Sequence, residues 1–319
     1  MPFEISKITP PYTSEAIPFV PESEQIDTDG ANYNGLGQIA SSMRFDFGLG
    51  SWYGDFGRYV FQSALYDCKD IDLKNKMFKV IDKANSCLKH YDVKCTDFLN
   101  PYEIKNAIAI LNSFNDIKYS VDGGYDNAER KVIFIYPYYM EYEDIECPLE
   151  IVQVEGNFKF KEISHKDYLG AILNLGIVRE KIGDIIIHEN FCQVVVTSGI
   201  CDFLTINLNK VSRNKVIVKK ISRDDIIPNS PNFKYISFTV SSQRLDCIIS
   251  GLYNISRQDS LKYINGERVH VNYEKITSPS KEVEDNSLIS VRGKGRSIII
   301  NVGEITKKGR IKVQAKLIV

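Results

Sequence analysis

Residues 244–272, "RLDCIISGLYNISRQDSLKYINGERVHVN", restrict the possible folds of this chain more than any other stretch. An apolar stripe at helical spacing runs along its first part: Leu245, Ile248, Ile249 and Leu252. Ser256 stands where a helix N-cap belongs, and Gly266 stands where the helix that it opens would end. The pattern predicts two short helices followed by a strand at residues 268–272.

Short alternating segments follow at residues 287–292, 297–303 and 310–319. Alternation of apolar and polar residues is typical of strands with one buried face. We therefore expect two antiparallel helices packed on a small, strongly twisted sheet.

Regular patterns also run from residue 73 to residue 221. Helices are expected at 73–91 and 100–114, strands at 117–121 and 131–139, and the run "PLEIVQVEG" is expected to complete a small mixed sheet. A second set comprises a helix at 165–176, a hairpin within 177–199, a helix at 200–211 and a strand at 214–221. The stretch "RDDIIPNSPNFKY" contains two Pro and is interpreted as a linker.

The first 72 residues differ from the rest, since they are acidic, rich in Pro and then in Gly and aromatics. We predict a modular α+β fold with a two-part α/β region ahead of a small C-terminal domain. The expected divisions are an N-terminal addition of unknown role at 1–72, α/β subdomains at 73–155 and 156–232, and the small domain at 240–319. The subdomain at 156–232 and the small domain at 240–319 are both expected to contact a nucleic acid.

Composition excludes several classes of protein. No apolar run reaches about 18 residues, so no membrane-spanning segment is expected. The first 22 residues lack the basic start and apolar stretch of a secretory signal, and the seven Cys form no regular spacing, which favours free thiols in a reducing cytoplasm. Cys87, His90 and Cys95 lack a fourth zinc ligand at suitable spacing, so neither a metal nor another cofactor is predicted.

Charge is unevenly distributed along a chain whose formal net charge is only −1. Residues 1–72 hold 4 Lys/Arg against 11 Asp/Glu, whereas residues 241–319 hold 14 against 8. Residues 210–223 hold six cations and no acid. Such segregation indicates basic working surfaces, for which nucleic acid is the usual partner.

Residues 244–272 resemble the S-four domain, a compact RNA-binding module. The resemblance is carried by Arg244 to Asp246, by Ser256 and Arg257, by Gly266 and by Val269 to Asn272, although Tyr273 replaces the Gly that usually follows. The segments "DGGYDNAERKVIFIYP", "HKDYLGAILNLGIVREKIGDI" and "VRGKGRSIIINVGEITKKGRIKV" are similar to bacterial YlmH-type proteins. This similarity covers about residues 73–319.

The resemblance implies a cytoplasmic RNA-binding protein without catalytic activity. Its implied partners are structured RNA (ribosomal RNA, tRNA or both) and the large ribosomal subunit, in ribosome rescue or quality control, with neither membrane nor DNA expected.

A Ser-Arg pair at a helix start combines N–H groups, a hydroxyl and a guanidinium that suit a phosphate. Asp246 is expected to orient a neighbouring Arg rather than to meet RNA. The residues expected to contact RNA are Arg244, Ser256, Arg257, Lys262, Arg268, Asn272, Lys275, Arg292, Lys294, Arg296, Lys307, Lys308, Arg310, Lys210, Arg213 and Lys215.

Two alternatives remain open at the level of sequence. An RNA-modifying enzyme could use the same domain for docking, and "DGGYDNAER" then supplies the best candidates for chemistry, Asp122, Asp126, Glu129 and Arg130. His or Cys partners for acid–base work are absent near them. A protein-interaction adaptor with an acidic contact surface at residues 1–72 is the other alternative.

Overall fold

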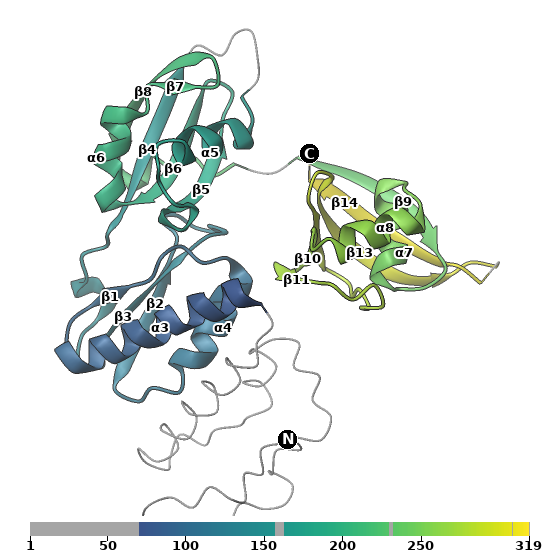
Figure 1. Ribbon diagram of the computed structural model, residues 1–319, viewed down its shortest axis with the longest axis horizontal. Helices are drawn as coiled ribbons and strands as arrows, with labels where there is room; N and C mark the ends of the chain where they lie inside the picture. Colours follow the sequence, from purple (N-terminus) through teal and green to yellow (C-terminus); the bar gives the residue numbers. More distant parts are fainter. Residues whose placement is uncertain (1–69, 157–162, 230–231, 308, 319) are drawn as a thin grey trace, which may run out of the picture.

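The computed structural model describes residues 70–156, 163–229, 232–307 and 309–318. The fold is modular α+β, with three antiparallel sheets (Figure 1). The expectations for residues 1–69 lie outside the described residues. None of the helices in the described ranges is both long and apolar enough to cross a membrane.

The first unit consists of two helices on a three-stranded sheet of order β1-β3-β2. Its elements are α3 (Ile71–His90), β1 (Lys94–Cys95), α4 (Pro101–Leu111), β2 (Ile117–Asp122) and β3 (Val132–Pro137). The predicted capping box at the start of α4 is confirmed, because Asn100 Oδ1 accepts from the N–H of Glu103 while Glu103 accepts from the N–H of Asn100. Both helices bury their apolar sides on Ile133 and Ile135 of β3.

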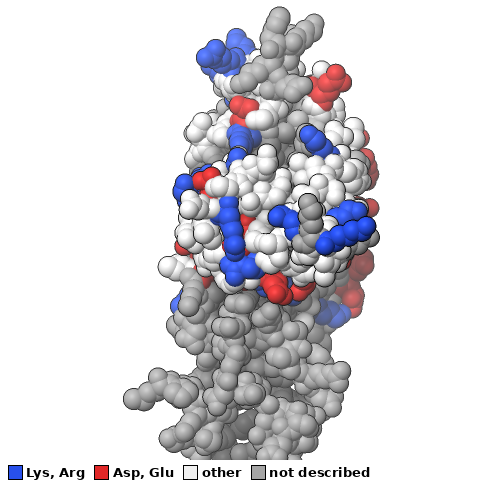
Figure 2. Space-filling model, turned by 90° about the vertical axis from the view of Figure 1, so that its right-hand side faces the viewer, with Lys and Arg blue, Asp and Glu red and all other residues white. Residues whose placement is uncertain are grey.

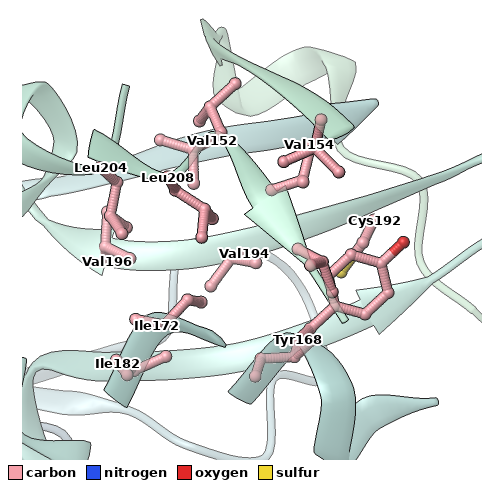
Figure 3. Packing of buried hydrophobic residues seen from close by; sticks show 14 of the residues in the cluster. Val152, Val154, Tyr168, Ile172, Ile182, Cys192, Val194, Val196, Leu204 and Leu208 are labelled. Carbon is pink, nitrogen blue, oxygen red and sulfur yellow. The ribbon is translucent and has the colours of Figure 1, made fainter. Parts of the chain in front are cut away.

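The second unit has a five-stranded sheet of order β5-β6-β4-β8-β7. Its elements are β4 (Leu149–Gly156), α5 (His165–Leu173), β5 (Ile182–Ile187), β6 (Phe191–Thr197), α6 (Ser198–Asn207), β7 (Lys210–Val211) and β8 (Asn214–Ile221), with short 3-10 turns at Tyr142–Asp144, Arg179–Lys181 and Arg223–Asp225. Helices α5 and α6 cover one face through a core that includes Tyr168, Ile172 and Leu204 (Figure 3).

The prediction that "PLEIVQVEG" completes the first sheet is wrong. This segment is β4, which pairs antiparallel with both β6 and β8 at the centre of the second sheet. Its side chains alternate between two cores: Val152 and Val154 face α5 and α6, whereas Ile151 faces the first unit. An apolar run in the sequence predicts that a strand is buried on both faces, but it does not predict which strands will be its neighbours in the sheet.

The two sheets pack against each other through their remaining faces. Alternate residues of β3 meet β4 and β6 in one shared core, whose buried members are Phe98, Val132, Phe134, Tyr136, Leu149, Ile151 and Val195. The first two units therefore form one body with helices outside and two sheets inside, in the layer order helix, sheet, sheet, helix.

The C-terminal domain has a six-stranded sheet of order β11-β10-β12-β13-β14-β9. Its elements are β9 (Phe233–Val240), α7 (Leu245–Tyr253), α8 (Arg257–Asn265), β10 (Val269–Val271), β11 (Glu274–Lys275), β12 (Leu288–Val291), β13 (Gly295–Ile305) and β14 (Ile311–Ile318). Both helices pack on one face. Gly251 permits α7 to approach the sheet closely, since a Cβ there would collide with the Phe238 ring.

The boundary expected at residue 240 leaves out β9, which pairs with β14 along its whole length, from Phe233↔Ile318 to Val240↔Ile311. The linker prediction extends too far, because the two Pro in its sequence obscure the alternation that begins at Phe233. The opposite side of this sheet is not covered by α7 and α8, and we call that side the open sheet face.

Candidate nucleic-acid interface

Asp246 organises the cations on the helical side of the C-terminal domain. Its carboxylate is only 1% exposed and accepts hydrogen bonds from Arg257 Nε at 2.7 Å and from Arg244 Nε at 3.2 Å. The N–H of Cys247 donates to the same group at 3.1 Å. Burial alone would raise the pKa of Asp246, but the hydrogen bonds and charges of Arg244 and Arg257 outweigh it and hold the pKa below its ordinary value.

The two arginines remain available to a ligand despite this anchoring. Their side chains are 41% and 55% exposed for Arg244 and Arg257. A guanidinium carries five N–H donors in a rigid fork, so one edge can be held by a carboxylate while the other faces outward. Asp246 therefore fixes the direction of two cations and reduces the entropy that they lose on binding.

Ser256 does not offer its hydroxyl to a ligand in this structure. Ser256 Oγ accepts from the N–H of Asp259 at 3.1 Å and donates to the Asp259 carboxylate at 2.7 Å. Lys262 Nζ donates to the same carboxylate at 2.8 Å. The start of α8 is thus capped by its own side chains, and its contribution to an anion site comes from Arg257.

The turn between β12 and β13 carries two further cations, Arg292 and Lys294, and Arg268 packs against this turn. Arg268 lies over the Tyr263 ring at 4.6 Å from its centroid and donates through Nη2 to the Arg292 carbonyl at 3.0 Å. Gly293 has φ +87°, and a Cβ there would lie 3.3 Å from Arg268 Nη2. The turn is closed by the N–H of Lys294 donating to the Val291 carbonyl.

Arg292 and Lys294 project from this turn, exposed and without an ion-pair partner among the described residues. The turn itself is held in place, since Tyr253 Oη donates to the Gly295 carbonyl at 3.1 Å. We call Arg244, Arg257, Lys262, Arg268, Arg292 and Lys294 the helix-face cations. They combine fixed backbone positions with outward charge, which suits the phosphates of a structured RNA.

Several other predicted residues are occupied within the domain. Asn272 has φ +50° and accepts from the N–H of Leu288 at 2.8 Å, so its side chain stabilises a strand junction. Lys275 pairs with Glu267 at 3.3 Å, and Arg310 donates to both the hydroxyl and the carbonyl of Thr239. Lys307 is exposed, and Lys308 lies outside the described residues.

Arg296 points away from the helix-face cations. It lies on the open sheet face and donates from Nη1 to both carboxylate oxygens of Glu129 in the first unit, at 2.8 Å each. Burial and the charge of Glu129 raise the pKa of Tyr273 to about 12. The structure thus joins "DGGYDNAER" to "VRGKGR" across 167 residues of sequence.

The β7–β8 hairpin forms a separate basic region. Lys210 and Lys215 face each other in register, Arg213 occupies the turn, and all three side chains are exposed. Further along β8, Lys219 pairs with Glu155 and Lys220 with Glu150. The hairpin belongs to the second unit, so the structure does not bring it into the group of helix-face cations.

Three of the four candidates for chemistry in "DGGYDNAER", Asp122, Glu129 and Arg130, make structural contacts, whereas Asp126 is exposed. Asp122 accepts from the N–H of Gly124, from Tyr142 Oη and from Arg223 Nη2, each between 2.7 and 2.9 Å. Arg130 donates to the carbonyls of Ile182 and Phe98. Across the described ranges, no group of three or more His, Cys, Asp or Glu is arranged to hold a metal ion.

Sequence reasoning missed the aromatic residues that support these cations. Tyr263 supports Arg268 from beneath, and Tyr253 fixes the turn of Arg292 and Lys294. Figure 2 shows the side of the molecule that carries the C-terminal domain, with Lys and Arg at several places among uncharged residues and with Asp or Glu beside some of them. An aromatic residue with cations nearby in an exposed helix is the signal that could have identified Tyr263.

Comparison with known families identifies two consecutive matches. The family described as "YlmH, N-terminal" matches residues 73–140, and the family described as "Putative RNA-binding domain in YlmH" matches residues 142–225. The division between them falls before β4, in agreement with the pairing of that strand in the second sheet.

A curated protein of Bacillus subtilis (strain 168), "Ribosome-associated protein quality control protein P2", is 31% identical over 225 residues, which is 70% of this chain and 87% of that protein. Among solved structures, "Cell division protein ylmH from Streptococcus pneumoniae" matches with a TM-score of 0.43 and 22% identity, covering 50% of this chain and 98% of that one.

Proposed function

Since this chain belongs to the YlmH family, we propose that it is a ribosome-associated RNA-binding protein that acts without catalysis. Its RNA is structured ribosomal RNA, tRNA or both, on the large ribosomal subunit, during rescue or quality control of stalled ribosomes. It works in the cytoplasm. The name of the B. subtilis relative, a ribosome-associated quality control protein, supports the ribosomal setting.

One observation carries the proposal of RNA binding: the C-terminal domain fixes its cations, since Asp246 holds two outward-facing arginines and the anchored β12–β13 turn presents Arg292 and Lys294. A-form RNA hides its base edges in a deep groove, so a small module recognises it by shape and phosphates. Rigid, spaced cations fit that task better than mobile ones, because less side-chain entropy is lost on binding. The basic hairpin at Lys210–Lys215 adds a second contribution, without such fixed side chains.

The absence of catalysis is supported by the engagement of two of the three carboxylates that could have acted in chemistry. Asp122 accepts hydrogen bonds from Gly124, Tyr142 and Arg223, and Glu129 is paired with Arg296. A general acid or base needs to reach a proton on its substrate, and these groups are already committed to holding parts of the molecule together.

Co-sedimentation tests the proposal. The purified full chain is mixed with large or with small ribosomal subunits and centrifuged through sucrose at moderate salt. We expect sedimentation with large subunits, and its loss in the double variant Arg292→Glu with Lys294→Glu. The matched control, Lys79→Glu with Lys89→Glu, changes the same charge on α3, outside the regions expected to contact RNA, and should sediment as the unmodified protein does.

Equal sedimentation with both subunits, or with neither, would contradict the large-subunit assignment. Crosslinking in cells followed by sequencing of the attached RNA identifies the RNA itself. Enrichment of messenger RNA over ribosomal RNA and tRNA would contradict the second part of the proposal.

A further inference from the structure

The open sheet face carries an exposed aromatic pair on its edge strand. Tyr235 is 71% exposed and Phe233 is 37% exposed. They are two residues apart on β9, so they lie on the same face with Cα atoms about 7 Å apart. The side chains of β9 alternate between the two faces of the sheet: Ile236, Phe238 and Val240 point into the core beneath α7, so Phe233 and Tyr235 point to the open sheet face. Large exposed aromatic residues that no core explains often mark a binding surface.

Cations surround this pair. Lys316 on β14 is the direct cross-strand partner of Tyr235, and its Nζ lies 4.5 Å from the centroid of the Phe233 ring. Farther along the same face, Arg310 is held over the end of β9 by its two hydrogen bonds to Thr239. Strands β9 and β14 contain no Asp or Glu. These two strands therefore contribute only positive charge to the face, while Glu129 of the first unit reaches it in a pair with Arg296 on β13.

We propose that Tyr235, Phe233 and Lys316 form a stacking platform for an unpaired RNA nucleotide, on the side of the C-terminal domain opposite the helix-face cations. The base stacks on the exposed Tyr235 ring, and the Lys316 ammonium meets the adjoining phosphate. Every base has a π-face, so stacking on aromatic residues accepts single strands of varied sequence. The inference rests on the proposed RNA-binding function and adds to it a class of ligand that phosphate contacts alone do not select.

The geometry favours a nucleotide over a protein strand as the occupant. β9 is an edge strand of the sheet formed by the described residues, but the exposed rings stand on its face rather than in its plane. A face with two aromatic rings and a lysine, on strands free of acids, is complementary to a base and its phosphate. A second copy of this chain would bring the same positive charges together, which opposes association.

The test uses a blunt RNA hairpin and the same hairpin with a short oligouridine overhang, each labelled and titrated with the full chain. We expect the overhang to raise affinity. Tyr235→Ala should remove that gain, a loss of about five- to one-hundred-fold, and should leave the affinity for the blunt hairpin unchanged. Tyr235→Phe keeps the ring and should retain the gain. Tyr139→Ala, at another exposed aromatic, is the matched control.

The outcomes separate the two proposals. If the blunt hairpin binds and the overhang adds nothing, the platform is refuted while the helix-face proposal stands. If neither RNA binds, both are refuted. Should Tyr235→Ala alter only the elution volume of the protein, the face is a protein contact and the platform is again refuted. As a second readout, a 5-iodouridine in the overhang should photocrosslink to Tyr235, and crosslinks exclusively to other residues would contradict the proposal.

Discussion

The helix-face cations and the cations of the β7–β8 hairpin are held in different ways. In the C-terminal domain a buried carboxylate holds Arg244 and Arg257, and an aromatic ring with a carbonyl holds Arg268. In the hairpin, Lys210 and Lys215 stand opposite each other, with like charge and exposed side chains. Cross-strand like charges destabilise a hairpin unless an anion lies between them.

This difference shows that a count of cations does not identify a specific binding surface. Both regions are basic, but only the first uses buried groups to fix where its charges point. Fixed guanidinium groups favour one arrangement of phosphates, whereas mobile lysines attract any polyanion through release of its counterions. The comparison therefore predicts specific recognition at the helix face and general electrostatic attraction at the hairpin.

The strongest way to break the comparison is Asp246→Ala. The substitution removes a buried acceptor of four hydrogen bonds and leaves two arginines directed at a vacated site. We expect the free energy of unfolding of the C-terminal domain to fall by about 3 kcal/mol, measured by hydrogen exchange of α7 and α8 in the full chain. Glu267→Gln, at an exposed ion pair with Lys275 outside both helices, is the control and should leave exchange nearly unchanged.

Charge reversal of the β12–β13 turn should have the next largest effect. In Arg292→Glu with Lys294→Glu we expect affinity for a structured ribosomal RNA fragment to fall at least about tenfold. The logarithmic salt slope should flatten by roughly 0.7 to 0.9 for each phosphate that the variant no longer binds. Lys210→Glu with Lys215→Glu should weaken the binding of all RNAs to a similar and smaller extent. If the hairpin variant instead lost preference for one RNA, the assignment of specificity to the helix face would be wrong.

Lowering the pH should sharpen the comparison further. The folded-state pKa of Asp246 is depressed, so the group contributes stability that is present above its ordinary pKa of about 3.9 and is lost as the pH falls through the folded value. Urea unfolding midpoints between about pH 5 and pH 2 should therefore fall more steeply for the unmodified chain than for Asp246→Asn. Other carboxylates with a lowered pKa, such as Asp122, contribute the same pH dependence of stability to both proteins. If the urea midpoints of the two proteins fell in parallel with pH, the charge of Asp246 would not contribute to stability through Arg244 and Arg257.

The smallest expected effect concerns the junction between the first unit and the C-terminal domain. Glu129→Gln weakens the contact with Arg296, a partly exposed pair worth about 1 kcal/mol or less. We expect a slightly larger radius of gyration by small-angle scattering and faster proteolysis between β8 and β9. Glu141→Gln removes a pair with Lys118 inside the first unit and should change neither quantity.

Much of the fold follows from local sequence signals, and much of the site does not. The capping box at Asn100 and the helices at 245–253 and 257–265 follow from short-range patterns, because caps and apolar stripes act within a few residues. The position of β4 in the second sheet depends on pairing with β6 and β8, which come much later in the chain. No local pattern encodes that choice.

The candidate site shows the same limit. The sequence motif predicts that Asp246 orients an arginine, and the structure places Arg244 and Arg257 on it. The pairing of Arg296 with Glu129 and the commitment of Asn272 to Leu288 depend on tertiary contacts that composition and spacing do not reveal. Sequence reasoning misses Tyr235, because the two Pro ahead of its strand predict a linker and hide its alternation.

The core shared by the two inner sheets limits where recombination can divide the gene without exposing apolar surface. Phe98 and Phe134 come from one family match, Ile151 and Val195 from the next, and all four are buried together. A genetic recombination breakpoint near residue 141 would leave each product with half of an apolar interface and nothing to cover it. A breakpoint near residue 230 would instead release a domain with its own complete sheet and core. Gene shuffling can therefore transfer the C-terminal domain to other proteins, whereas residues 73–225 must descend as one piece.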